Sequence, residues 1–117
     1  MKKIIHVDHS AFFRKFLRSF LQREGFEVES YDNTRDSTFA IGVGSVDMVI
    51  IGLTFVDAEG EEFLERIQQT YAGPVIVLSS SVDKAEVEEK LLTLGITDAI
   101  SKTGPWQQRL KQHLLEL

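Results

Sequence analysis

Apolar residues are arranged along this chain in two different patterns. Short apolar runs of strand length alternate with longer segments whose apolar residues repeat at helical spacing. The predicted strands cover residues 4–7, 26–31, 47–51, 74–79 and 97–101. The predicted helices begin after Ser10, at Asn33, at Gly60, at Asp83 and at Pro105. Residues 48–51 and 75–78 are apolar on both faces, as in inner strands of a covered parallel sheet. We therefore predict a doubly wound α/β domain with a five-stranded parallel sheet and five helices.

Local signals support several of these boundaries. Ser10 is suited to cap the first helix and Gly25 to end it. Residues 83–86, Asp-Lys-Ala-Glu, have the pattern of a capping box for the fourth helix. Pro105 suits the first turn of the fifth helix. In the first helix one broad apolar stripe is predicted to face the core, and it consists of Phe12, Phe13, Phe16, Leu17, Phe20 and Leu21.

Length, charge and composition narrow the possible functions. A chain of 117 residues fits a single domain, so we expect residues 1–117 to fold as one unit. The absence of cysteine excludes disulfides, thiolate metal sites and cysteine nucleophiles. A net charge of -5 argues against direct nucleic-acid binding. The apolar runs are too short to span a bilayer, and the first residues lack the pattern of a signal peptide, so we expect a cytoplasmic domain.

The residues that follow the predicted strands are the candidates for chemistry. In an open parallel sheet, ligands bind at the carboxyl ends of the strands, where the strand order reverses. Asp8 and His9 follow the first strand, and Gly52 follows the third. Ser79 ends the fourth predicted strand, and Lys102 follows the fifth. We expect these five residues to lie together at one edge of the sheet.

This succession resembles the receiver domain of bacterial response regulators, a flavodoxin-like fold with strand order 2-1-3-4-5. The resemblance is carried, in order along the chain, by residues 4–8, 47–52, 74–79 and 95–102. It implies a metal-assisted phosphoryl acceptor site. Two acids after the first strand and an aspartate after the third would hold the metal. That aspartate would take the phosphoryl group, beside a hydroxyl after the fourth strand and a lysine after the fifth.

The chain departs from this pattern at the acceptor position. Asp8 matches the first acid, His9 replaces the second, and Ser79 and Lys102 are retained. Gly52 stands where the resemblance implies the phosphate-accepting aspartate, and glycine has no group that could form an acyl phosphate. Only Asp8 remains as a clear metal ligand, so we expect no cofactor and at most weak magnesium binding.

Two further departures concern the relay of the signal. Ala99 stands in the fifth strand where the family has an aromatic residue that changes rotamer on activation. Thr103 follows Lys102, at a position where the family has a proline. Both departures fit a domain that lacks the usual phosphorylation switch.

Several individual residues allow more than one interpretation. His9 is either a metal ligand beside Asp8 or a solvated loop residue. His6, within the first strand, is either a hydrogen-bonded core histidine or a pH sensor. Lys102 either pairs with Asp8 across the pocket or binds an anion. Ser79 either contacts phosphate or satisfies hydrogen bonds of the following loop and helix.

The leading hypothesis is a non-enzymatic pseudo-receiver of a two-component pathway that binds a protein partner, or a second copy, without phosphorylation. It could precede a C-terminal output domain. The expected contact face lies on the fourth helix, fifth strand and fifth helix, and it offers Lys84, Glu88, Lys90, Asp98, Lys102 and Arg109. Trp106, at the start of the fifth helix, is either part of this face or a core residue. One alternative is a receiver phosphorylated on another residue. A weaker alternative is a flavin or nucleotide binder, although residues 8–13 offer one serine and two phenylalanines instead of a phosphate loop.

Overall fold

The structure, a computed structural model, describes residues 1–55 and 58–117. Its strands, all parallel, are β1 (Lys3–Val7), β2 (Glu27–Tyr31), β3 (Met48–Ile51), β4 (Val75–Leu78) and β5 (Asp98–Ile100). Its helices are α1 (Ala11–Arg23), α2 (Thr34–Val43), α3 (Ala58–Gln68), α4 (Ala85–Thr93), α5 (Trp106–Leu115) and a short 3-10 helix, η1 (Ser80–Asp83). The strand order β2-β1-β3-β4-β5 and the five α-helices confirm the predicted doubly wound fold.

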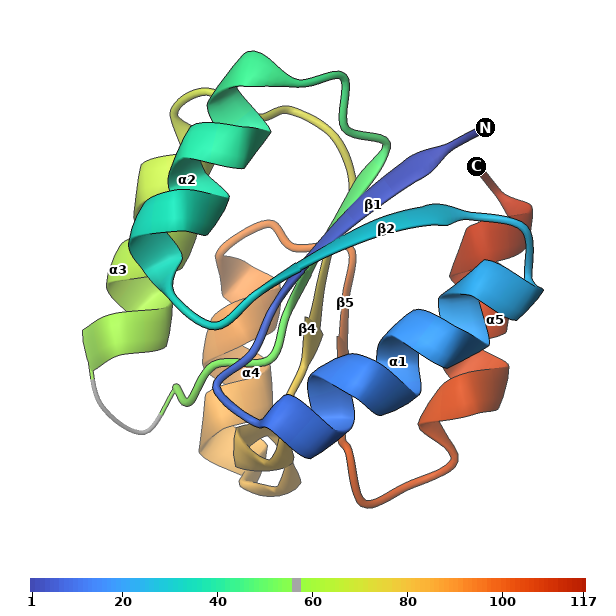
Figure 1. Cartoon of the computed structure of the whole chain (residues 1–117). Helices are drawn as coiled ribbons and strands as arrows, with labels where there is room; N and C mark the ends of the chain where they lie inside the picture. The colour runs from blue at the N-terminus through green and yellow to red at the C-terminus, as the bar shows by residue number, and fades with distance from the viewer. Residues whose placement is uncertain (56–57) are drawn as a thin grey trace.

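The sheet separates two apolar layers, with α1 and α5 on one face and α2, α3 and α4 on the other (Figure 1). Neighbouring residues of β1 pack in opposite layers. Ile4 packs with α1 and α5, while Ile5 packs with α2, α3 and α4. Met48 and Val49 of β3 divide in the same way. This double burial explains why the inner strands carry apolar residues without alternation.

The ends of the first two helices follow the local sequence. Ser10 caps α1, because its hydroxyl accepts a hydrogen bond from the Phe13 N–H at 3.1 Å. Asn33 caps α2 through the Asp36 N–H at 2.8 Å. Gly25 follows α1 with a φ of +92°, a left-handed conformation that glycine adopts without a steric penalty. The predictions for Ser10, Gly25 and Asn33 are thereby confirmed.

Two predicted helix starts were wrong. Residues 80–83 form η1, and α4 begins after Lys84, which makes no side-chain capping bond. The Asp83 carboxylate accepts hydrogen bonds from the hydroxyls of Ser101 and Thr103, so it is not available for a capping box. Helix α3 begins at Ala58 instead of Gly60. The loop before it, predicted over 53–59, includes residues 56 and 57, which lie outside the described part of the chain.

The predicted core stripe of α1 was too broad. Leu17 and Leu21 are fully buried, but Phe12 is 75% exposed and Phe16 is 45% exposed. A helix that covers a sheet buries only the residues directed at the sheet and at its helical neighbour. Phe12 and Phe16 are one turn apart on the outer side, and their ring centroids lie 5.9 Å from each other. Part of the aromatic surface of α1 is therefore exposed.

Candidate functional site

The carboxyl ends of β1 and β5 bring a carboxylate and an ammonium group into contact. The Nζ atom of Lys102 lies 2.7 Å from Oδ2 of Asp8. The Asp8 side chain is 3% exposed and that of Lys102 is 20% exposed. The same Nζ atom lies 4.4 Å from the centre of the Phe13 ring, where a cation is attracted by the π system. Lys102 therefore pairs with Asp8, one of the two interpretations that the sequence left open.

The backbone around Asp8 holds its carboxylate in place. The Ser10 N–H donates to Oδ1 at 2.8 Å, and the Arg14 guanidinium donates to the Asp8 carbonyl oxygen at 2.7 Å. Burial alone would raise the pKa of Asp8, but the Lys102 ammonium and the Ser10 N–H hold it below its ordinary value. The carboxylate is therefore ionised at neutral pH. Phe13 and Arg14 were not identified from the sequence as contributors to this site, although their place in the first turn after Ser10 brings them near it.

Asp8 also fills the space above Gly52. The Gly52 N–H donates to the Val7 carbonyl oxygen at 2.8 Å, which places Gly52 beside Asp8 on the neighbouring strand. A Cβ atom built on Gly52 would overlap Oδ2 of Asp8 and would lie 2.7 Å from its Cγ and 3.0 Å from its Cβ. The φ angle of Gly52 is not positive, so the backbone itself does not demand glycine. Glycine is needed here for room, because the carboxylate occupies the volume of a side chain at position 52.

His6 is a core residue, as one of its two interpretations required, but the ring lacks the hydrogen bond that this interpretation included. Its ring is fully buried, and neither ring nitrogen has a hydrogen-bond partner among the described residues. A charged atom, Oδ2 of Asp8, lies 3.5 Å from Nε2. Burial lowers the pKa of His6, against the opposing effect of Asp8, so the ring is neutral at neutral pH.

His9 points away from Asp8. Its Nε2 atom lies 2.8 Å from Oε1 of Glu59, and its Nδ1 atom donates to the Asp32 carbonyl oxygen at 2.9 Å. The carboxylate of Glu59 is the largest cause of a raised pKa at His9, since it stabilises the imidazolium form. Among the described residues no three His, Asp or Glu side chains gather as a possible metal site. His9 is thus engaged in a contact that joins the loop after β1 to the first turn of α3 and to the residue after β2.

The two remaining candidates are buried. Ser79 is 3% exposed, and its hydroxyl accepts from the Ser81 N–H at 3.2 Å, which caps η1. This contact favours the interpretation of Ser79 as a local hydrogen-bonding residue. Ala99 is 1% exposed and packs in the layer beneath α4. The strand ends therefore bring together Asp8, Gly52 and Lys102, while His9 and Ser79 are occupied elsewhere.

Comparison with known families identifies the domain. The family described as the response regulator receiver domain matches residues 4–114. The chain belongs to this family. Its receiver fold is shared by solved structures, which include the receiver domain of a response regulator, 1452, from Francisella, with a TM-score of 0.85 at 19% identity over 98% of this chain and 95% of that one. The chemotaxis protein CheY4 of Vibrio cholerae has a TM-score of 0.81 at 24% identity, over 99% of this chain and 98% of that one.

Curated relatives of this receiver domain are longer proteins. The KDP operon transcriptional regulatory protein KdpE of Escherichia coli (strain K12) is 30% identical over 116 residues, 95% of this chain and 50% of that protein. The regulatory protein VanRc of Enterococcus gallinarum is 28% identical over 86% of this chain and 43% of that protein. A protein-glutamate methylesterase/protein-glutamine glutaminase of Rhodospirillum rubrum is 32% identical over 87% of this chain and 28% of that protein. The receiver domain thus spans half or less of these relatives.

The α4-β5-α5 face of the receiver domain is narrower than predicted. Lys90 pairs with Glu61 of α3 at 2.7 Å, Lys102 turns inward to Asp8, and Trp106 is only 5% exposed. Lys102 and Trp106 therefore do not contribute to the face, while Lys90 stays exposed on it. Asp98 forms ion pairs on it with Arg109, at 2.6 Å, and His113, at 2.8 Å.

None of the helices in the described ranges has the length and apolar character needed to cross a membrane.

Proposed function

We propose that this receiver domain acts as a pseudo-receiver, a protein-interaction module of two-component signalling that works without aspartyl phosphorylation. The observation that carries the proposal is that the Asp8 carboxylate occupies the space of a side chain at position 52. Gly52 follows β3, where the resemblance implies the acceptor, and the volume of its missing side chain is filled by Asp8. Lys102, which would stabilise a phosphoryl group, already neutralises that carboxylate.

The chemistry of phosphoryl transfer supports the same proposal. Transfer to a carboxylate needs a divalent metal and a cation to neutralise charge on the transferring group. Magnesium prefers octahedral oxygen ligands, and Asp8 offers carboxylate oxygens already engaged by Lys102 and the Ser10 N–H. His9, at the place of the second acid, is directed at Glu59. Magnesium titration should therefore shift the amide signals of Asp8 and Gly52 only well above the concentrations that saturate a receiver domain with three carboxylates.

The direct test is phosphorylation by a small-molecule donor. The domain is incubated with acetyl phosphate and magnesium, beside a receiver domain that has an intact acceptor aspartate as the control for donor activity. Intact mass should rise by one phosphate in the control and remain unchanged in this domain. A mass gain that hydroxylamine removes marks an acyl phosphate and would refute the proposal. The variant Asp8→Asn would then show whether Asp8 serves as the alternative acceptor.

The interaction part of the proposal concerns the α4-β5-α5 face. Charges of both signs remain there, since Lys84 and Arg109 are exposed and Glu88 and Asp98 are half-buried. Mixed charge of this kind favours a specific, salt-sensitive contact with a partner protein or a second copy. Because the domain offers no acceptor at Gly52, its self-association in sedimentation experiments should not respond to acetyl phosphate with magnesium. A donor-dependent change in association would contradict phosphorylation-independent function.

A further inference from the structure

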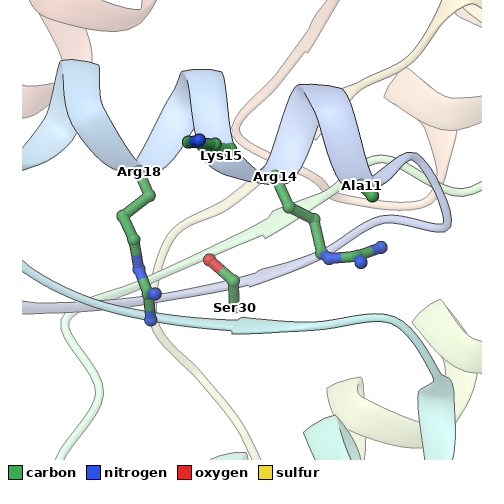
Figure 2. A pocket seen from close by; sticks show the side chains of 5 residues that line it. All are labelled: Ala11, Arg14, Lys15, Arg18 and Ser30. Atoms are coloured by element: carbon green, nitrogen blue, oxygen red, sulfur yellow. The ribbon is translucent and has the colours of Figure 1, made fainter.

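A small basic cavity lies between α1 and β2, apart from the contact of Asp8 with Lys102. Its volume is about 240 Å³, and it is lined by Ala11, Arg14, Lys15, Arg18 and Ser30. Figure 2 shows Arg14 and Arg18 reaching down from α1 on either side of Ser30, whose hydroxyl points up toward the helix. Three cationic side chains therefore line a cavity beside one hydroxyl, and one of them, Arg14, also contacts the Asp8 carbonyl oxygen.

The positive charge of this cavity contrasts with the rest of the chain. The net charge of the protein is -5, yet α1 carries four basic residues and no acidic one over its thirteen residues. Arg14 and Arg18 each lie against a neutral carbonyl oxygen, that of Asp8 at 2.7 Å and that of Val28 at 3.5 Å. Within residues 1–55 and 58–117, neither guanidinium forms an ion pair with a carboxylate.

One exposed acidic group faces Arg14. The carboxylate of Asp32 accepts a hydrogen bond from the Asn33 side chain at 2.8 Å, and this bond, followed by the charge of Arg14, holds the pKa of Asp32 below its ordinary value. Asp32 is fully exposed to solvent and does not line the cavity. Solvent screening weakens its effect on Arg14, so the cavity keeps its positive charge.

Ser30 provides an independent reason to expect an occupant. Its Oγ atom is buried and has no hydrogen-bond partner in the described part of the chain. Buried hydroxyls are normally paired, because an unmade hydrogen bond leaves the cost of removing the group from water uncompensated. A serine in place of alanine at this point is therefore unfavourable for the empty domain. An anion that displaced the cover of this atom from the cavity side would accept the missing hydrogen bond.

We propose that this cavity binds a small phosphate-bearing anion, either inorganic phosphate or a compact phosphate monoester. The guanidinium groups of Arg14 and Arg18 match the geometry of phosphate oxygens, Lys15 adds a point charge, and Ser30 donates from below. The volume is smaller than the roughly 300–1,000 Å³ of sites for drug-sized ligands, which favours a compact occupant. The site shares Arg14 with the surroundings of Asp8, but it does not include Gly52 and does not depend on the pseudo-receiver proposal.

The test is a titration of the whole chain with inorganic phosphate, followed by amide chemical shifts at constant ionic strength. Saturating shifts are expected at Ala11, Lys15 and Ser30. Arg18→Gln, or Lys15→Gln if the first variant folds poorly, should weaken binding about tenfold. Arg23→Gln removes the same charge from the same helix outside the cavity, so it should bind like the wild type. Equal weakening by Arg18→Gln and Arg23→Gln, or shifts that do not saturate, would overturn the proposal in favour of diffuse charge attraction.

Ser30→Ala separates a built site from a chance group of charges. The variant should bind phosphate several-fold more weakly, while the melting temperature without phosphate stays the same or rises, because a buried unpaired hydroxyl has been removed. Unchanged phosphate affinity in Ser30→Ala would contradict the role of the hydroxyl.

A final pair of titrations distinguishes a free phosphate monoester from a lipid headgroup. A nucleoside monophosphate should produce the same pattern of shifts as phosphate. Vesicles that contain phosphatidate should bind no better than vesicles of phosphatidylcholine alone. Binding to phosphatidate vesicles without a saturating response to phosphate or to the nucleotide would overturn the proposal. It would instead assign the charge of α1, with exposed Phe12 and Phe16, to a membrane surface.

Discussion

The substitution Gly52→Ala tests the steric relation at the centre of the site. The added methyl group would overlap Oδ2 of Asp8, so the Asp8 carboxylate must move. Movement weakens two contacts at once, the ion pair with Lys102 at 2.7 Å and the hydrogen bond from the Ser10 N–H at 2.8 Å. Because the φ angle of Gly52 is not positive, backbone strain adds nothing to this effect.

The magnitude follows from the cost of overpacking a buried site. Inserting one carbon atom into a well-packed interior typically costs about 1–3 kcal/mol. Asp8 is held on both carboxylate oxygens, so we expect Gly52→Ala to lower the free energy of unfolding by about 2 kcal/mol. For a domain near this size that corresponds to a fall in melting temperature of roughly 10 °C.

Urea denaturation of four proteins measures the effect and its cause. The wild type, Gly52→Ala, Asp8→Ala and the double variant form a double-mutant cycle. In the Asp8→Ala background the carboxylate is gone and only the Cβ contact at 3.0 Å remains, so Gly52→Ala should cost less than about 1 kcal/mol. Gly42→Ala, in α2 with nothing within 4 Å of its added Cβ, is the control and should stabilise the domain by about 0.5–1 kcal/mol. An equal cost of Gly52→Ala in both backgrounds would refute the steric explanation.

Three further predictions address acceptor repair, pH and the contact face. Gly52→Asp alone should restore little labelling by acetyl phosphate, and adding His9→Asp should raise the yield; equal yields by intact mass would show that His9 is not a second defect. Burial lowers the pKa of His6, so the unfolded chain binds a proton near pH 6.5 that the folded chain does not, and stability should fall as the pH drops below that value. His6→Leu should flatten this slope in urea titrations between pH 7 and 5, and an unchanged slope would contradict the assignment. Charge reversal at Glu88 or Arg109 should weaken partner binding or self-association. The melting temperature should change little, because exposed ion pairs contribute about 0–1 kcal/mol to stability. Binding that survives both reversals but is lost on substitution in α1 would place the interface elsewhere.

The sequence predicted the fold well where the signals were local. Runs such as residues 48–51 have no polar position, so only a strand covered on both faces can accommodate them. Ser10 and Asn33 cap their helices through neighbours three residues away. The capping box at 83–86 failed because Asp83 binds Ser101 and Thr103, 18 and 20 residues away, and such a long-range competitor leaves no mark in the local pattern.

The candidate site was predicted in part. Strand order alone brings Asp8 beside Gly52, because Val7 and Ile51 are register partners at the ends of β1 and β3. The contact of Asp8 with Lys102 was one of two alternatives, and only side-chain positions could choose between them. The overlap of the Asp8 carboxylate with the volume above Gly52 depends on the orientation of one side chain, which residue types and spacing do not determine.

The contacts of the individual residues bear on how such a domain could be controlled. Each group that would serve a phosphoryl group has another partner, since Lys102 contacts Asp8, Ser79 accepts from Ser81 and His9 contacts Glu59. Receiving a phosphoryl group would require several of these contacts to break together. A ligand shifts a conformational equilibrium only by its difference in affinity between two states, and on the pseudo-receiver proposal a phosphate donor would supply little difference. Control of this domain would then come from the abundance of its partner or from binding elsewhere, and the cavity between α1 and β2 is the place where a diffusible anion could act.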